Sequence, residues 1–222
     1  MSETRSSLVV VPFLAEDPHL VALTFNLAAA HPAVAEVIGV HGSDESTVAR
    51  VRSLAPAFRT VPQKRIGLLR PGKGDAINTG FDYFLASSHN RLHFFDADIK
   101  TFDGTWIEHA EVGLDHGFDT VRHFYPRAAT DGMITAMLTR PGMAMLWPHS
   151  ILSRIKQPLS GEVAFTRHAV ELLVSEPGVR EQSDWGIDTV ITVSSTRLGL
   201  SLFENFVAAG KDHKLYDGLD DL

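Results

Sequence analysis

The sequence predicts an α/β fold in which helices flank a mostly parallel central sheet. Residues 8–13, Leu-Val-Val-Val-Pro-Phe, form a continuous apolar run, which is typical of a strand buried on both faces in a parallel sheet. Strand and helix patterns then alternate through residue 54, as expected for an α/β protein. The chain of 222 residues, 44% of them hydrophobic, is long enough to bury a sizeable core as one globular domain.

Composition excludes several classes of protein. A net charge of −7 argues against nonspecific nucleic-acid binding. No apolar run has the length of a membrane span, and residues 1–7 lack the apolar stretch of a secretory signal. Without cysteine, neither a disulfide nor a thiolate metal site can form. We therefore expect a soluble, cytoplasmic protein that binds neither nucleic acid nor membrane, and any metal must be held by Asp, Glu and His.

The first elements follow in a regular order. After the strand at 8–13, Pro18 opens a helix that runs toward residue 31, because proline is well suited to the first helical turn. A second strand is predicted over 34–40, and a second helix over 43–54. Open sheets bind ligands beyond the carboxyl ends of their strands, so residues 12–16, 40–43 and 96–98 should meet in one crevice.

The alternation continues in the rest of the chain. A glycine-rich loop leads into a helix that carries Ile77, Phe81, Phe84 and Leu85 on its apolar positions. Further helices are predicted over 106–114 and 167–175, and another opens at 183–188. Residues 119–125 and 200–207 are predicted strands, and residues 157–162 a turn.

Two carboxylates follow a short buried strand. Leu92, Phe94 and Phe95 predict that strand, and Asp96 and Asp98 stand where it should stop. With small Ala97 between them, these oxygen ligands suit a divalent cation such as Mg²⁺ or Mn²⁺ that also holds phosphate oxygens. Taken alone, the Asp-x-Asp pattern is better explained as a turn or helix cap.

A basic, glycine-rich loop spans residues 63–75. Its cations are Lys64, Arg65, Arg70 and Lys73, and glycines stand on both sides of Lys73. Such a loop before a helix could bind a pyrophosphate. The spacing is not that of a P-loop, and a surface turn explains the composition equally well.

Three later positions could contact a substrate. Arg127 and the hydroxyl of Thr135, around a helix start at Thr130 or Asp131, could bind a small carboxylate, although an N-cap beside a surface arginine has the same pattern. Trp185 could stack on a sugar or simply pack. His213, in a polar loop, could be a third metal ligand.

Taken together and in order, these segments resemble the mannosylglycerate synthase family. The matching stretches are residues 70–75, 93–98, 121–123, 146–149, 183–188 and 215–216. The resemblance implies a retaining GT-A glycosyltransferase that moves mannose from GDP-mannose to D-glycerate. It also implies the Rossmann-like GT-A fold for nucleotide-diphospho-sugars in one catalytic domain over 1–222, with a nucleotide-binding half at about 1–100 and an acceptor-binding half at about 101–222.

The resemblance assigns each candidate residue a role. Asp98 and His213 would coordinate the divalent metal, Mg²⁺ or Mn²⁺, and Asp96 would hold the ribose and help orient the metal. Glu16 would accept hydrogen bonds from guanine, Lys214 and Tyr216 would approach the diphosphate, and Asp188 would bind mannose hydroxyls. The implied nucleotide-sugar set is Pro12, Phe13, Leu14, Ala15, Glu16, Val40, Gln63, Lys73, Asp96, Ala97, Leu159, Asp188, Lys214 and Tyr216. Arg127 would pair with the glycerate carboxylate. The implied acceptor set is Arg127, Asp131, Gly132, Met133, Ile134, Thr135 and Trp185.

The implied mechanism differs from that of a retaining hydrolase, in which one of two carboxylates acts as the nucleophile. In the family the backbone around Leu159 lies beneath the sugar, which favours front-face attack. The catalytic residues would be Leu159, Asp188 and Lys73. Lys73, Lys214 and the metal would stabilise the departing diphosphate, which accepts the proton of the acceptor hydroxyl.

Other interpretations remain open. The chain has Leu14 where the family carries a basic residue, and related enzymes accept GDP-glucose as well as GDP-mannose or use another small hydroxy acid. A sugar-nucleotide pyrophosphorylase would place its glycine-rich basic loop straight after the first strand, whereas here it follows the second helix. A non-catalytic nucleotide-sugar-binding protein is a third alternative, and a homo-oligomer is one of the quaternary states left open.

Overall fold

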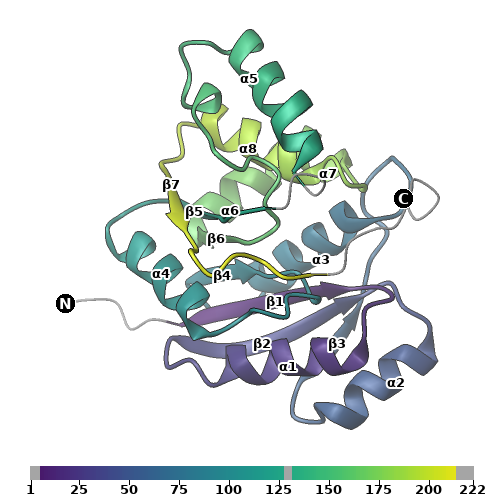
Figure 1. The fold of residues 1–222 in the computed structure, drawn as a ribbon. Coiled ribbons are helices and arrows are strands. Elements are labelled where there is room, and N and C mark those ends of the chain that lie inside the picture. Colours follow the sequence, from purple (N-terminus) through teal and green to yellow (C-terminus); the bar gives the residue numbers. More distant parts are fainter. Residues whose placement is uncertain (1–5, 128–131, 214–222) are drawn as a thin grey trace.

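The sheet has seven strands in the order β3-β2-β1-β4-β6-β5-β7 (Figure 1). The computed structural model describes residues 6–127 and 132–213. The strands are β1 (Ser7–Phe13), β2 (Val34–His41), β3 (Arg59–Pro62), β4 (Arg91–Phe94), β5 (Thr120–Phe124), β6 (Val163–Thr166) and β7 (Leu202–Phe206).

Most strand pairs are parallel. β1 pairs in parallel with β2 and β4, β2 with β3, and β5 with β7, whereas β6 runs antiparallel between β4 and β5. The prediction of a mostly parallel α/β sheet is therefore confirmed. The strands β3 and β6 were not predicted. In β3 only Val61 is apolar apart from the final proline, and β6 leads directly into α6 with no turn between them.

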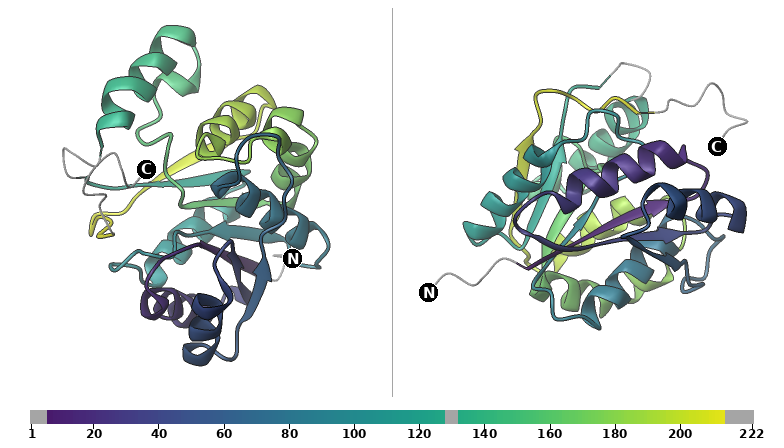
Figure 2. Two further views of the ribbon diagram at one scale, coloured as in Figure 1. Left: turned by 90° about the vertical axis from the view of Figure 1, so that its right-hand side faces the viewer. Right: turned by 90° about the horizontal axis from the view of Figure 1, so that it is seen from below.

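Helices lie on both faces of the sheet (Figure 2). They are α1 (Pro18–Ala29), α2 (Glu45–Leu54), α3 (Lys73–Leu85), α4 (Gly104–Asp115), α5 (Arg140–Leu146), α6 (Arg167–Val174), α7 (Pro177–Glu181) and α8 (Ile187–Arg197), with a π-helical turn η1 (Thr135–Thr139) and a 3₁₀ turn η2 (Ile151–Ser153). Side-chain caps fix several starts: Asp44, for example, accepts a hydrogen bond from the Thr47 amide at 2.9 Å. None of the helices in the described residues is long and apolar enough to cross a membrane.

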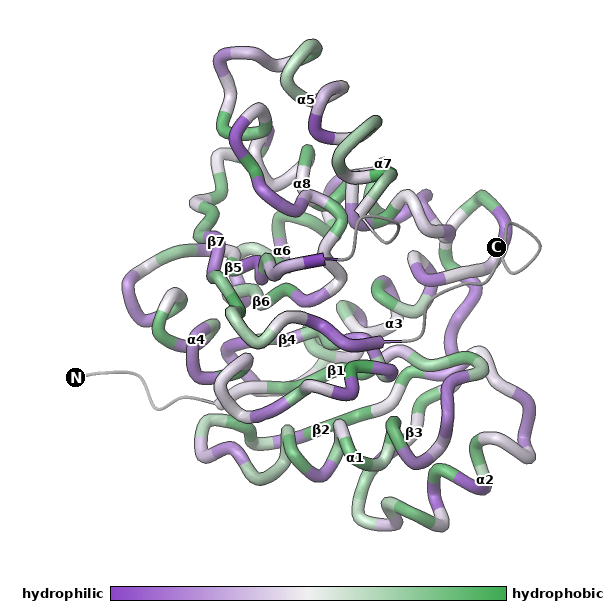
Figure 3. The backbone as a smooth tube through the Cα atoms, viewed as in Figure 1, coloured by the Kyte–Doolittle hydropathy of each residue, from purple (hydrophilic) through white to green (hydrophobic). Residues whose placement is uncertain are grey.

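Side chains on the two faces of β1 pack into two separate hydrophobic cores. Leu8 and Val10 pack with α3, α6 and α8, whereas Val9 and Val11 pack with α1, α2 and α4. All four side chains are fully buried, as expected for a central strand covered on both sides. In Figure 3, hydrophobic and hydrophilic stretches alternate along α1 and α2, which turn one face to the sheet.

The segment η1–α5 extends away from the sheet (Figures 1 and 2). A small core of Met143, Leu152 and Ile155 holds it together. It begins at Thr135 and follows directly on residues 132–134, and the sequence predicts that residues 132–135 contact the acceptor. The sheet edge at the carboxyl ends of β1, β2 and β4 thus faces loops from both halves of the chain.

Candidate functional site

Two ammonium groups and three carboxylates from separate elements meet beyond the carboxyl end of β4. Lys73, the first residue of α3, lies 3.2 Å from Asp96 and 3.3 Å from Asp188 in the first turn of α8. Lys211 lies 2.6 Å from the other Asp96 oxygen and 2.7 Å from Glu162. Asp96 is therefore bound through both oxygens, each by a different lysine.

Glu162 anchors the far end of this network. The hydroxyls of Tyr125 and Ser160 both donate to its Oε2 at 2.8 Å, while its Oε1 receives the ammonium of Lys211. The Glu162 side chain is fully buried. A buried carboxylate with three donors is satisfied and rigid, so it can serve as a fixed support.

Burial and charge oppose one another at these groups. Burial alone would lower the pKa of Lys73, but the carboxylates of Asp188 and Asp96 outweigh it and raise the pKa above the ordinary lysine value. Burial likewise tends to raise the pKa of Asp96, and Lys211 and Lys73 together hold it well below the usual range. Both groups stay charged at neutral pH.

Asp188 behaves differently from Asp96. Burial raises its pKa, and the nearby cations of Lys73 and Arg122 offset only part of that shift. The Asp188 carboxylate thus pairs with Lys73, but nearby cations compensate its negative charge less completely than they do for Asp96. A carboxylate of this kind can accept hydrogen bonds from a polar ligand such as a sugar hydroxyl.

Close backbone packing explains the glycines of the basic loop. A Cβ on Gly74 would lie 2.7 Å from the Ser183 carbonyl carbon, and the Asp75 amide donates to the Ser183 carbonyl at 3.1 Å. The loop is thereby bound to residues 181–184. Arg65 and Arg70 pair with Asp75 and Asp184, so Lys73 is the cation that this loop directs at Asp96.

The predicted metal ligands Asp98 and His213 are brought together. The distance between Asp98 Oδ2 and His213 Nδ1 is 3.8 Å, across more than 100 residues of sequence. A carboxylate and an imidazole suit Mn²⁺ or Mg²⁺ with further oxygen ligands from a bound diphosphate or water, so this donor set fits the metal. Within residues 6–127 and 132–213, no group of three or more side chains is arranged to hold a metal alone.

The residues predicted for the nucleotide border the same edge. Phe13 and Val40 are buried in the core, so they can offer a nucleotide only backbone groups. Leu14 is 60% exposed, and its amide donates to Glu16 Oε2 at 2.5 Å. Burial raises the pKa of Glu16. Among the remaining predicted contacts, Pro12 is partly exposed, Ala15 is exposed and Ala97 is buried. The Nε2 of Gln63 donates to the Gly72 carbonyl at 3.2 Å.

The acceptor residues are only partly described. Arg127 lies over the ring of Tyr125, with its guanidinium carbon 5.9 Å from the ring centroid. Thr135 is buried, whereas Met133 and Ile134 are exposed and Gly132 is half-buried. Trp185 is 53% exposed, and the Lys73 ammonium lies 5.8 Å from its ring centroid. Asp131, Lys214 and Tyr216 lie outside the described residues.

Sequence reasoning missed Arg122, Glu162 and Lys211. The buried Arg122 guanidinium donates to the carbonyls of Pro158 and Ser160, on either side of the predicted catalytic position Leu159, at 3.1 and 2.6 Å. These residues stood within segments that the sequence marked as a strand, a turn and a polar loop. A charged residue inside the predicted strand at 119–125 was the one signal that could have identified Arg122.

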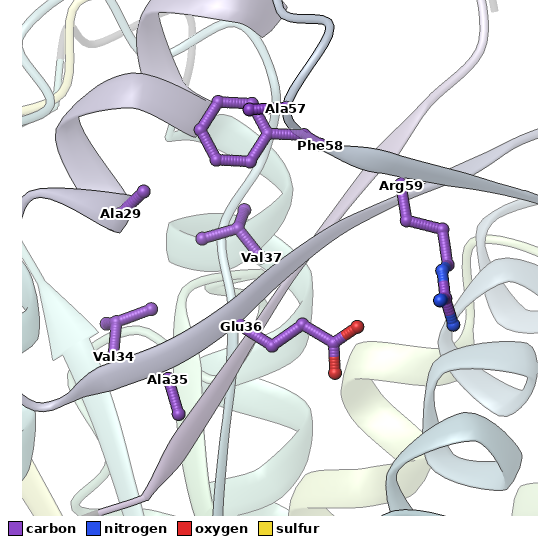
Figure 4. Close-up of a pocket in the computed structure, with 8 residues that line it drawn as sticks. All are labelled: Ala29, Val34, Ala35, Glu36, Val37, Ala57, Phe58 and Arg59. Atoms are coloured by element: carbon purple, nitrogen blue, oxygen red, sulfur yellow. The ribbon is translucent and has the colours of Figure 1, made fainter.

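A separate pocket of about 280 Å³ lies near the amino ends of β2 and β3, and Figure 4 shows the side chains that line it. It is lined by residues 34–37 of β2, by residues 57–59 and by Ala29. Because these residues precede the strands' carboxyl ends, this pocket is distinct from the candidate site.

The fold and the site define a GT-A-type nucleotide-sugar transferase architecture. The solved structure of glucosyl-3-phosphoglycerate synthase from Mycobacterium tuberculosis, in complex with Mg²⁺ and UDP, matches with a TM-score of 0.78 and 26% identity, over 98% of this chain and 74% of that one. The same enzyme has been solved with Mn²⁺, UDP-glucose and phosphoglyceric acid, with equal coverage and TM-score.

The particular family is shown by sequence. The family model described as mannosylglycerate synthase, GT domain, matches residues 7–222, so the chain belongs to the mannosylglycerate synthase family. Mannosylglycerate synthase from Rhodothermus marinus is 45% identical over 97% of this chain and 57% of its own length, and that from Selaginella moellendorffii is 44% identical over 97% and 54%. The chain thus spans about half the length of these curated relatives.

Proposed function

We propose that this chain is the catalytic domain of a retaining glycosyltransferase that transfers mannose from GDP-mannose to D-glycerate with the help of Mg²⁺ or Mn²⁺. The observation that carries the proposal is the meeting of Lys73, Asp96 and Asp188 beside the pair Asp98–His213 at one sheet edge. The nucleotide-binding half is residues 1–100 and the acceptor-binding half residues 101–222, approximately.

Asp98 and His213 are the residues that would hold the metal. When bound, the metal supplies charge stabilisation for the diphosphate that leaves the sugar. Lys73 adds a permanent positive charge to the same region, since its pKa is raised and its ammonium is fixed by two carboxylates. Asp96, held by two lysines, presents its remaining lone pairs to the ribose.

Asp188 and the turn at 158–160 would form the sugar subsite. Three hydrogen bonds fix the backbone of this turn. Arg122 and Thr192 both donate to the Pro158 carbonyl, and Arg122 also donates to the Ser160 carbonyl. A fixed backbone at Leu159 beneath the sugar shields one face and directs the acceptor to the other. Attack on the face that the diphosphate leaves retains the anomeric configuration.

The acceptor would bind between the network and the η1–α5 segment. Arg127 supplies a guanidinium that can pair with a carboxylate in bidentate fashion. Thr135 begins η1 nearby in sequence and would hold a hydroxyl. Glycerate offers both groups, a carboxylate and hydroxyls, which matches this pair of residues.

The main competing function is transfer from a different sugar donor to a different acceptor. Glucosyl-3-phosphoglycerate synthase has been solved with UDP-glucose and phosphoglyceric acid, and its structures share this fold at 26% identity. UDP-glucose and 3-phosphoglycerate are therefore the specific alternatives to GDP-mannose and glycerate.

A donor comparison tests the proposal. Calorimetric titration of the chain with GDP and UDP, each with and without Mn²⁺, should give Mn²⁺-dependent binding of GDP that is at least about tenfold tighter than that of UDP, equal to roughly 1.4 kcal/mol. Equal or tighter binding of UDP would favour the glucosyl alternative. Absence of Mn²⁺-dependent binding of either nucleotide would contradict both functions.

A further inference from the structure

We propose that the buried ion pair between Lys211 and Glu162 positions the metal-ligating segment, so that both residues act as positioning residues for the divalent-cation site. Neither was predicted from the sequence to take part in the site. The inference rests on the proposed function, which places a cation at Asp98 and His213. It goes beyond that function by assigning the support that brings His213 to Asp98.

The pair joins a buried, fully hydrogen-bonded carboxylate to a segment of irregular backbone. Glu162 is fully buried and receives hydrogen bonds from Tyr125 and Ser160, each at 2.8 Å. Lys211, only 5% exposed, reaches inward to Glu162 at 2.7 Å and to Asp96 at 2.6 Å. The lysine thus ties residues 210–213, which carry no regular secondary structure, to the turn before β6 and to the Asp-Ala-Asp turn.

The neighbouring residue is held from the opposite side. The Lys100 amide donates to the Asp212 carbonyl at 2.8 Å, the Asp212 amide donates to Thr101 Oγ1 at 3.1 Å, and the Lys100 ammonium pairs with the Asp212 carboxylate at 3.1 Å. The Lys211 and His213 side chains are 5% and 14% exposed and reach the carboxylates of the Asp-Ala-Asp turn, whereas the Asp212 side chain between them is 61% exposed. Lys211 and His213 therefore both face inward, and fixing Lys211 fixes the approach of His213 to Asp98.

Positioning and simple electrostatics predict opposite effects for one substitution. Removing the Lys211 ammonium removes a positive charge from a cation site, which on charge alone would tighten metal binding. If Lys211 positions His213, the same change must weaken it. Removing the Glu162 charge weakens metal binding on either view, so Lys211 is the decisive residue.

The test measures Mn²⁺ affinity in the presence of GDP from the electron paramagnetic resonance signal of unbound Mn²⁺. Loss of a residue that orients a metal ligand typically costs 10–100-fold in metal affinity, so Lys211→Met and Glu162→Gln should each weaken Mn²⁺ binding by about tenfold or more. The double variant should be weakened by about as much as either single variant, because both break the same link. Lys100→Met, which removes only the exposed ion pair to Asp212, is the matched control and should bind Mn²⁺ as the wild type does.

Thermal unfolding of each variant shows whether it has folded. Should Lys211→Met not fold, Lys211→Gln provides the same loss of charge in a polar side chain, and Lys211→Arg should restore affinity to within about threefold because it keeps the charge. Wild-type or tighter Mn²⁺ affinity in a folded Lys211 variant without the charge would overturn the inference while leaving the proposed function standing. Failure of the wild type to bind Mn²⁺ with GDP would overturn both.

Discussion

A single ammonium group, that of Lys73, joins three elements of the fold. It begins α3, pairs with Asp96 after β4 and with Asp188 in α8, and lies over the ring of Trp185. This placement explains why one lysine among the four cations of the basic loop belongs to the site. Arg65 and Arg70 of the same loop pair instead with Asp75 and Asp184.

Asp98 offers the most direct test at the level of a single residue. Asp98→Ala removes one of two proposed metal ligands, so the rate of sugar transfer should fall by at least about 100-fold, the usual cost of losing a principal source of transition-state charge stabilisation. The fold should persist, because Asp98 lies in a half-buried turn after β4 and outside every described helix and strand. Initial rates of GDP release at saturating Mn²⁺ measure the effect.

Glu171→Ala is the control for Asp98→Ala, since Glu171 is an exposed carboxylate on α6, a helix that carries none of the candidate site residues. It should transfer sugar at the wild-type rate. An Asp98→Ala protein with wild-type turnover would refute the metal assignment.

The turn at 157–162 borders the ion pair between Lys73, at the start of α3, and Asp96. A Cβ added to Gly161 would lie 2.9 Å from Asp96 Oδ1 and still closer to the Lys73 ammonium. The turn therefore leaves no room for a side chain at Gly161 beside these two charged groups. Two elements that the sequence separates by more than 70 residues thus share one surface of the site.

Gly161→Ala tests this close approach. The added methyl group should push the flexible end of Lys73 away from Asp96 and reduce kcat by about tenfold, equivalent to roughly 1.4 kcal/mol of transition-state stabilisation. The change in unfolding free energy should be small, because a side-chain end can move more easily than backbone. Steady-state kinetics and urea unfolding separate the two effects.

Gly178→Ala is matched to that variant, because a Cβ at Gly178 has no neighbouring atom within 4 Å. Its kinetics should equal those of the wild type. Unchanged kcat in Gly161→Ala would mean that the contact between Lys73 and Asp96 is irrelevant to turnover.

The whole molecule is stabilised by a second buried charge cluster, at the amino ends of β1 and β4. Glu111 of α4 accepts hydrogen bonds from Ser7 at 2.5 Å and from His93 at 2.7 Å, and it pairs with Arg91. Burial tends to raise the pKa of Glu111, but hydrogen bonding and charge from His93, with Ser7 and Arg91, lower it to about 2. The cluster connects β1, β4 and α4.

Acid should therefore destabilise the fold through Glu111. Its pKa is lower in the folded chain than in the unfolded one, so its contribution is complete above about pH 5 and is lost as the pH falls toward 2, amounting to about 3 kcal/mol. Glu111→Gln should lower the unfolding free energy at pH 7 by a similar amount and make it less dependent on pH between 5 and 3. Urea unfolding across this range measures both, with exposed Glu171→Gln as control; parallel pH profiles for Glu111→Gln and the wild type would contradict the assignment.

Much of the architecture could be predicted from local sequence patterns. The runs at 8–13 and 34–40 are apolar because both faces of β1 and much of β2 are covered, and the Asp-Ala-Asp turn follows β4 as predicted. β3 and β6 could not be predicted, since β3 has little apolar pattern and β6 leads directly into α6. Their pairing partners, rather than any pattern of their own, make them strands.

The network within the site was less predictable than the sheet. Lys211 lies 115 residues from Asp96 and 49 from Glu162, and nothing in either local sequence indicates the contact. Asp98 and His213 were paired through resemblance to a family, and the structure brings them near one another. Buried ion pairs between distant segments arise from the tertiary fold, so local patterns cannot reveal them.

Product analysis is the most direct test of the proposed transfer of mannose to glycerate. The chain should be incubated with GDP-mannose and Mn²⁺, with and without D-glycerate, and the product identified by mass and by proton NMR of the anomeric centre. We expect GDP release that requires both metal and glycerate, together with an α-linked mannosylglycerate. A β-linked product, or GDP release that glycerate does not accelerate, would contradict it.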